Sequence, residues 1–210
     1  MKTITILFIL IFSSCAFNKH QNHFENIKKW VKLFENDKRE IWQRPNLVIN
    51  RVGVKKDSII ADIGSATGYF PVRLAKKANK GRVWAIDIEP QLVNYLNQRA
   101  KKEQISNLTS ILGTKSDAMI PEAVDFIFSV DTYHHIKNRK DYFKNLQKKL
   151  KEEGKVVIID FKKGDFPIGP PNSAKISREN VIKEMKQAGL QLKSTHDFLI
   201  YQYILVFTKS

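Results

Sequence analysis

The sequence predicts an α/β fold: a doubly wound, mostly parallel sheet of seven strands with an antiparallel last strand and an N-terminal helical lid. Short apolar runs alternate with segments whose apolar residues recur every three or four positions, which is typical of parallel strands joined by helices. The last two runs, residues 190–196 and 198–207, follow each other without a helix between them, so they predict an antiparallel pair. At 210 residues, the chain is large enough for one well-buried core.

The composition leaves two explanations for the basic charge of the chain. A net charge of +15 and a pI near 9.8 are compatible with nucleic-acid binding. However, the lysines are spread in pairs over every predicted helix, with no dense basic arm, which favours a solubilising surface. We therefore expect no nucleic-acid partner.

Residues 1–22 read as a leader and tether rather than as part of the fold. Lys2 provides a short basic segment before an apolar run over residues 4–12, and Ser13-Ser14 then precede Cys15. This arrangement resembles a bacterial lipoprotein signal, which implies a lipid anchor at Cys15 and attachment to the envelope membrane. An ordinary cleaved signal and an uncleaved apolar tail are the alternatives. If the leader is not functional, we expect a cytoplasmic protein.

Residues 23–53 predict the helical lid, and residues 54–210 the main domain. Apolar residues recur at helical spacing over 23–36, and a second helix is expected over 38–51, where Pro45 bends or restarts it.

The sequence is organised around residues 58–70, which predict a strand, a tight turn and the start of a helix. Gly64 and Gly68 bracket the turn, where glycine permits positive φ and lets a ligand lie against the backbone. Asp62 places a carboxylate beside this turn, which would repel a phosphate and attract a cationic ligand. With the bulky Tyr69, it disfavours a dinucleotide site and NAD-dependent oxidoreduction.

The segment Asp62-Ile63-Gly64-Ser65-Ala66-Thr67-Gly68 resembles the first motif of class I S-adenosylmethionine-dependent methyltransferases, with Ala66 where that family most often has glycine. The alternative is a structural glycine turn in another α/β protein. The resemblance implies S-adenosylmethionine as cofactor and the strand order 3-2-1-4-5-7-6, with the last strand reversed. It also implies that the helices before residue 54 cover the cofactor, so that Trp42 and Arg44 either face the ligand or belong to the core.

Further cofactor contacts are expected along the chain. The strand 82–87 ends in Asp87, the position where α/β nucleotide folds place a carboxylate for ribose hydroxyls. A strand over 108–112 leads to a loop with Asp117, where the resembling family accepts a hydrogen bond from the adenine amino group, although a lone loop aspartate is more often a turn residue. The resemblance adds contacts from Ile88, Ala118 and Ser129.

The strand 124–130 is followed by the densest cluster of polar chemistry, Asp131-Thr132-Tyr133-His134-His135. Ligands of open α/β sheets lie beyond the carboxyl ends of the strands, so we expect this cluster to border the transferred methyl group. His134 or His135 is the expected general base, and Tyr133 is expected to orient the acceptor. Alternatively, a histidine here only caps the loop.

The last third of the sequence completes the alternation. A helix over 138–151 ends before Gly154, a strand covers 155–161, and the proline-rich loop 162–172 is either a substrate wall or a connector. Ser177 caps a helix that Gly189 ends.

The predicted function is methyl transfer from S-adenosylmethionine to a small-molecule acceptor. The His-His pair resembles small-molecule methyltransferases rather than enzymes with an Asn-Pro-Pro-Tyr clamp. No metal site is predicted, and the single cysteine argues against the three-thiol arrangement of arsenite methyltransferases. The alternatives are an RNA methyltransferase and a non-catalytic envelope lipoprotein that keeps the fold.

Overall fold

The computed structural model describes residues 27–210. The expected leader and tether, with the lipid anchor at Cys15, lie outside these residues, as does the start of the first predicted helix. No helix within residues 27–210 is both long and apolar enough to cross a membrane.

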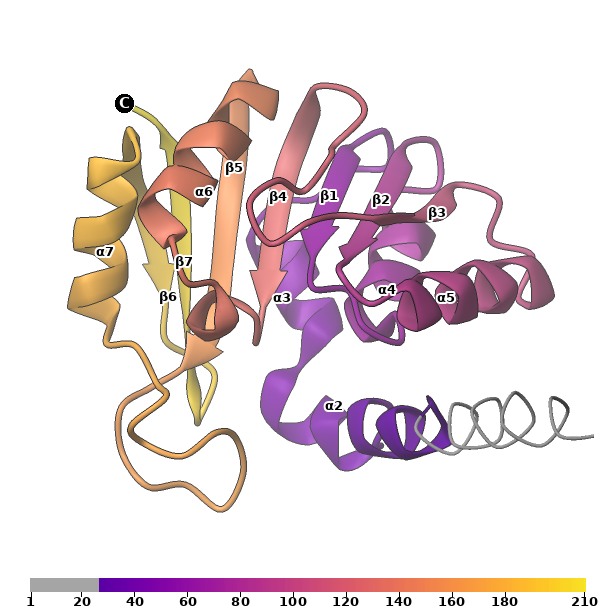
Figure 1. Cartoon of the computed structure of the whole chain (residues 1–210), viewed down its shortest axis with the longest axis horizontal. Coiled ribbons are helices and arrows are strands. Elements are labelled where there is room, and N and C mark those ends of the chain that lie inside the picture. Colours follow the sequence, from indigo (N-terminus) through magenta and orange to yellow (C-terminus); the bar gives the residue numbers. More distant parts are fainter. Residues whose placement is uncertain (1–26) are drawn as a thin grey trace, which may run out of the picture.

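The core of the fold is a seven-stranded sheet with the order β3-β2-β1-β4-β5-β7-β6 (Figure 1). Its strands are β1 (Ile59–Ile63), β2 (Arg82–Asp87), β3 (Leu108–Leu112), β4 (Val124–Val130), β5 (Leu150–Phe161), β6 (Leu190–His196) and β7 (Gln202–Lys209). Only β7 runs antiparallel to its neighbours, β5 and β6. The predicted fold class, strand order and reversed strand are confirmed.

Helices cover both faces of this sheet, with α6 and α7 on one face and α3 and α4 on the other (Figure 1). The helices are α2 (Lys38–Gln43), α3 (Pro45–Arg51), α4 (Tyr69–Lys77), α5 (Pro90–Lys102), α6 (Arg139–Leu146) and α7 (Arg178–Gln187), with short 3-10 turns η1 (Tyr133–His135) and η2 (Gln147–Lys149). Local sequence explains their boundaries. The Ser177 hydroxyl accepts a hydrogen bond from Asn180 N at the start of α7, and Gly189 follows that helix with a φ of 80°.

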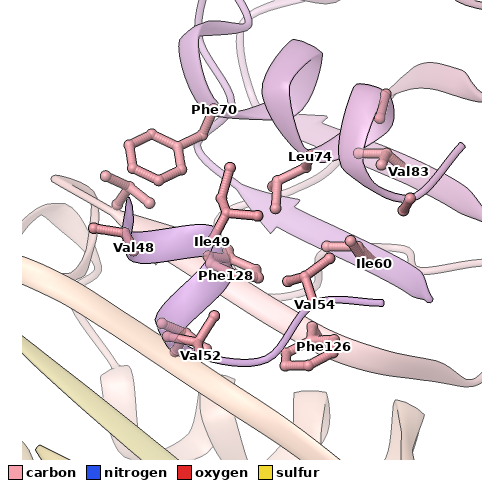
Figure 2. Close-up of a cluster of buried hydrophobic side chains, with 14 of the residues drawn as sticks. Val48, Ile49, Val52, Val54, Ile60, Phe70, Leu74, Val83, Phe126 and Phe128 are labelled. Carbon is pink, nitrogen blue, oxygen red and sulfur yellow. The ribbon is translucent and has the colours of Figure 1, made fainter. Parts of the chain in front are cut away.

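Two apolar clusters, one on each face, hold the layers together. On one face, Val48 and Ile49 of α3 pack with Leu74 of α4 against Ile60 and Phe128 of the central strands (Figure 2). All five are at most 2% exposed. The cluster on the opposite face includes Phe143 and Met185, from α6 and α7. Because both faces are covered, the strand ends are where polar side chains gather.

The lid begins with a helical segment over residues 27–34 and continues through α2, beyond the carboxyl ends of β4 and β5 (Figure 1). Arg44 adopts a left-handed conformation with a φ of 48°, and Pro45 begins α3, so Pro45 restarts the helix. The Trp42 ring lies 5.8 Å from Phe161 and 6.4 Å from Tyr201, measured between ring centroids. Trp42 therefore packs at the carboxyl end of β5, while Arg44 is exposed.

Two predicted boundaries are wrong. Residues 150–154 extend β5 instead of ending the preceding helix, because Leu150 pairs with Val124 across an irregularity in the β4–β5 ladder. The final strand begins at Gln202 rather than at Phe198.

Candidate functional site

The glycine turn after β1 is held against the neighbouring strand by its own backbone. Gly64, Ala66 and Gly68 have φ values of 73°, 47° and 98°. The amides of Gly64 and Ser65 both donate to the carbonyl of Ile86, at 2.8 and 3.0 Å. A Cβ atom at position 64 would lie 2.3 Å from the Thr132 hydroxyl. Glycine is therefore required at position 64 both by the backbone angle and by the close approach of the β4 loop.

Asp62 is a buried carboxylate with an incomplete set of partners. Its side chain is 2% exposed, and its Oδ1 has no hydrogen-bond partner among the described residues. Burial, and then the charge of Asp87, raise the pKa of Asp62 well above its ordinary value, while Arg39 opposes the shift. An unpartnered buried carboxylate oxygen is costly, so it indicates a position for a donor or cationic ligand.

Asp87 ties the end of β2 to the glycine turn. Its Oδ2 accepts a hydrogen bond from Ala66 N at 2.9 Å, and its Oδ1 accepts one from Glu89 N at 3.0 Å. A carboxylate has about four acceptor positions, so capacity remains for hydroxyl groups of a ligand. Ile88, the next residue, is 46% exposed and offers an apolar surface beside it.

The other expected cofactor residues lie in different surroundings. Asp117 is exposed, and its Oδ1 accepts from Met119 N at 2.8 Å, so it acts as a turn residue in this structure. Ala118 is fully buried in the apolar cluster that contains Ile120. Ser129 is also fully buried, and its hydroxyl has no partner among residues 27–210.

The two histidines after β4 occupy different environments. His134 Nδ1 lies 2.9 Å from both carboxylate oxygens of Asp160, and its side chain is 4% exposed. Because a carboxylate only accepts, Nδ1 carries the proton and Nε2 is the proton-accepting atom. Burial lowers the pKa of His134, but the hydrogen bond to Asp160 and the charges of Asp160 and Asp131 outweigh it and raise the pKa. His135 is exposed, and its pKa is lowered by burial and by His134.

Tyr133, the residue expected to orient the acceptor, lies in the apolar layer that it forms with α6 and α7. Its ring is fully buried, and the centroid lies 5.3 Å from that of Phe143 in the α6–α7 layer. Its hydroxyl donates to Glu184 at 2.6 Å. Tyr133 therefore anchors the loop to α7, away from the lid.

Sequence reasoning named Asp131 but missed the largely buried polar cluster that Asp131 forms with Arg39, Gln43 and Gln202. Arg39 Nη2 and Gln43 Nε2 each lie 3.0 Å from Asp131 Oδ2, and Gln43 Nε2 also lies 3.0 Å from Gln202 Oε1. Burial raises the pKa of Asp131 to about 6, although Arg39 opposes the shift. Asp131 has a φ of 55° and directly follows β4, a strand-end position that is the one available sequence signal.

A second set of contacts ties the lid to the glycine turn. Glu35 Oε1 lies 2.8 Å from Arg99 Nη1 and 2.7 Å from the Thr67 hydroxyl. Arg99 also donates to the Thr67 carbonyl at 2.9 Å. These contacts line a hollow of about 920 Å³ between the lid and helices α3, α4 and α5. The charged groups that line this hollow include Glu35 and Arg99, which pair with each other. Asp62, whose Oδ1 has no partner among the described residues, is not part of the lining.

Within residues 27–210, no three His, Cys, Asp or Glu side chains gather in a way that could hold a metal ion.

Comparison with known proteins identifies the fold. A sequence profile described as "Methyltransferase domain" matches residues 54–202. The crystal structure of a SAM-dependent methyltransferase from Aquifex aeolicus is 26% identical, with a TM-score of 0.80, and the alignment covers 88% of this chain and 98% of that one.

Two relatives have named substrates. The (S)-coclaurine N-methyltransferase of Thalictrum flavum subsp. glaucum is 20% identical over 137 residues, which cover 63% of this chain and 38% of the relative. The erythromycin 3''-O-methyltransferase of Saccharopolyspora erythraea is 22% identical over 176 residues, which cover 72% of this chain and 58% of the relative. The chain thus spans less than two thirds of the length of these relatives.

The residues present fit S-adenosylmethionine. The unpartnered Oδ1 of Asp62 suits a ligand that carries an ammonium and a sulfonium. The matched profile covers well over half of the sequence, and the fold agrees with it. The chain therefore belongs to the methyltransferase domain family, and its cofactor is S-adenosylmethionine.

Proposed function

We propose that this protein transfers the methyl group of S-adenosylmethionine to a small-molecule acceptor, with His134 as the general base. The observation that carries the proposal is the fixed pair of His134 and Asp160 at the carboxyl ends of β4 and β5. S-adenosylmethionine supplies an activated methyl group whose leaving group is already in place. The protein's remaining tasks are to align the acceptor and to remove its proton.

The proton has a defined acceptor atom. Asp160 is fully buried and holds Nδ1 of His134, so the ring is oriented and Nε2 accepts the proton that the acceptor loses. The charge of Asp160 then stabilises the imidazolium that forms. The exposed ring of His135, whose centroid lies 4.0 Å from that of His134, borders the acceptor in this proposal.

In this proposal the cofactor binds at the carboxyl ends of β1 and β2, beside the glycine turn. Asp62 takes the cationic end, Asp87 takes the ribose hydroxyls, and Ile88 packs against the base. The remaining proposed contacts are Gly64, Ala66, Gly68, Asp117, Ala118 and Ser129.

A small acceptor is favoured over RNA by the charge of the site. Asp62, Asp131 and Asp160 are three carboxylates at adjacent strand ends, with Arg39 as the cation held against Asp131. This local charge repels a phosphate backbone, although the whole chain is strongly basic. The names of two relatives also support a small molecule, since one acts on coclaurine and another on erythromycin, whereas two other relatives are named for tRNA.

The test is to incubate the full chain with methyl-labelled S-adenosylmethionine and either a metabolite extract or total RNA. We expect label in a small molecule and loss of labelling in His134→Gln, while the matched variant His196→Gln, in β6, keeps it. Label only in RNA would overturn the acceptor class. Absence of cofactor binding by calorimetry would instead support a non-catalytic envelope protein.

We also propose that Cys15 carries a lipid anchor that attaches the domain to the envelope membrane. The proposal rests on the sequence of residues 4–15. Metabolic labelling with a fatty acid tests it, because Cys15→Ser removes the label if the proposal is correct. A chain that stays unlabelled in its native form contradicts it.

A further inference from the structure

We infer that Arg39 of the lid binds the α-carboxylate of the cofactor's methionine end, so that Arg39 and Asp62 together recognise its amino-acid group. The inference rests on the proposed function and adds a lid residue to the binding site. It assigns to Arg39 a selectivity for ligands that carry an intact amino acid.

The position of Arg39 is fixed by two groups at the relevant strand ends. Its guanidinium carbon lies 4.3 Å from the ring centroid of Tyr69, which directly follows the glycine turn. Its Nη2 lies 3.0 Å from Asp131, which directly follows β4. Strands β1 and β4 are neighbours, so the guanidinium lies over the junction where a ligand of an open α/β sheet binds.

Asp62 provides the opposite charge at the same junction. It is the penultimate residue of β1, its Oδ1 has no partner among the described residues, and the charge of Arg39 opposes the rise in its pKa that burial causes. An α-amino acid carries an ammonium and a carboxylate on adjacent atoms. A buried acid on β1 and a largely buried guanidinium at the end of the neighbouring strand β4 match both charges.

Arg39 also has donors to spare. A guanidinium has five N–H groups. Those of Arg39 reach the side chain of Gln43, the carbonyl of Phe34 and Asp131, through Nε, Nη1 and Nη2 in turn. One N–H therefore remains on each of the two terminal nitrogens, and a carboxylate is the group that accepts such a pair.

A second arginine supplies a matched control. Arg73 lies against the same Tyr69 ring, with its guanidinium carbon 4.1 Å from the centroid. It pairs with Glu40 at 3.0 Å and lines the hollow between the lid and helices α3, α4 and α5. Removing either charge perturbs the same ring, but of the two arginines only Arg39 contacts Asp131, which follows β4.

The experiment compares two adenosine thioethers by calorimetry on the full chain. S-adenosylhomocysteine has the amino-acid end, and 5′-methylthioadenosine lacks it. We expect Arg39→Gln to weaken binding of S-adenosylhomocysteine by about tenfold or more, and to change binding of 5′-methylthioadenosine by less than about twofold. Arg73→Gln is expected to leave both affinities within about twofold of the native protein.

The possible results distinguish a failure of the Arg39 assignment from a failure of the proposed function. Retained binding of 5′-methylthioadenosine shows that the Arg39 variant is folded. An unchanged ratio of the two affinities in Arg39→Gln overturns the role of Arg39. If the native chain binds neither compound, the proposed function itself fails.

Discussion

His134 is held by Asp160 across the carboxyl ends of two neighbouring strands, with Nδ1 2.9 Å from each carboxylate oxygen. Asp160 is fully buried and also accepts the backbone amide of His134 at 3.1 Å. The acid therefore fixes both the loop and the ring, and its effect on proton transfer is measurable separately from its effect on folding.

Asp160→Asn is expected to lower the pKa of His134, because the raising contributions of the hydrogen bond and the charge are lost while burial persists. The acid limb of the rate profile then moves to lower pH, and kcat falls by about tenfold or more because the amide no longer stabilises the imidazolium. NMR titration of the His134 ring checks the pKa. An unchanged pKa in a folded variant would remove Asp160 from the proton-transfer argument.

Asp62→Asn is expected to stabilise the ligand-free protein and to weaken cofactor binding. The substitution removes a buried charge whose Oδ1 has no partner, which we expect to raise the free energy of unfolding by about 1 kcal/mol. The same loss weakens the attraction for a cationic ligand, by about tenfold in Kd. Urea unfolding and calorimetry measure the two effects. A variant that loses stability would show that Asp62 serves the fold.

Asp131 is expected to make the protein less stable as pH rises. Its pKa is about 6 in the folded state and about 3.9 when unfolded, so the folded state binds the proton more tightly. Its contribution is complete below pH of about 4 and is lost as pH rises through about 6, a loss of about 2–3 kcal/mol.

Urea unfolding at several pH values tests the Asp131 prediction. Asp131→Asn should flatten the decline between these limits, and the difference between the two curves isolates Asp131 from other groups. Parallel curves for the native protein and the variant would refute the shift.

Ala66→Gly is expected to raise the free energy of unfolding by about 0.5–1 kcal/mol. Ala66 has a φ of 47°, where a Cβ atom is strained and glycine is not. Ala75→Gly, in the middle of α4, is the matched control and is expected to destabilise by about 1 kcal/mol or more. Chemical denaturation checks both. Equal destabilisation by the two substitutions would mean that the turn carries no strain at Ala66.

The sequence predicted the sheet well because buried parallel strands leave continuous apolar runs. The bounds of β2, β3 and β4 agree with the predicted ones. Errors arose where pairing decides the structure: residues 151–153 are charged and Gly154 follows them, yet Leu150 pairs with Val124 and extends β5. Asp62 and Asp87 were predicted as site residues because they lie near the carboxyl ends of two strands in a recognisable motif.

The rest of the site depends on contacts between distant parts of the chain. Arg39 and Gln43 lie on a short lid helix whose sequence gives no sign of what it covers, and they reach Asp131 only in the folded protein. Asp160 follows an apolar run, so the strand-end rule alone would have found it. The packing of Tyr133 into the α6–α7 layer is not visible in the sequence, because the periodicity of a strand does not extend into the 3-10 turn that follows.

The buried amide of Gln43 has a kinetic consequence. The Gln43 amide contacts both Asp131, which follows β4, and Gln202 in β7. If α2 lifts, both contacts break at once, and buried polar groups lose their hydrogen-bond partners. Helix α2 then separates from the strand ends in one cooperative step rather than by gradual fraying. We therefore expect the exchange of ligands beneath α2, rather than methyl transfer, to be the rate-limiting step of the catalytic cycle.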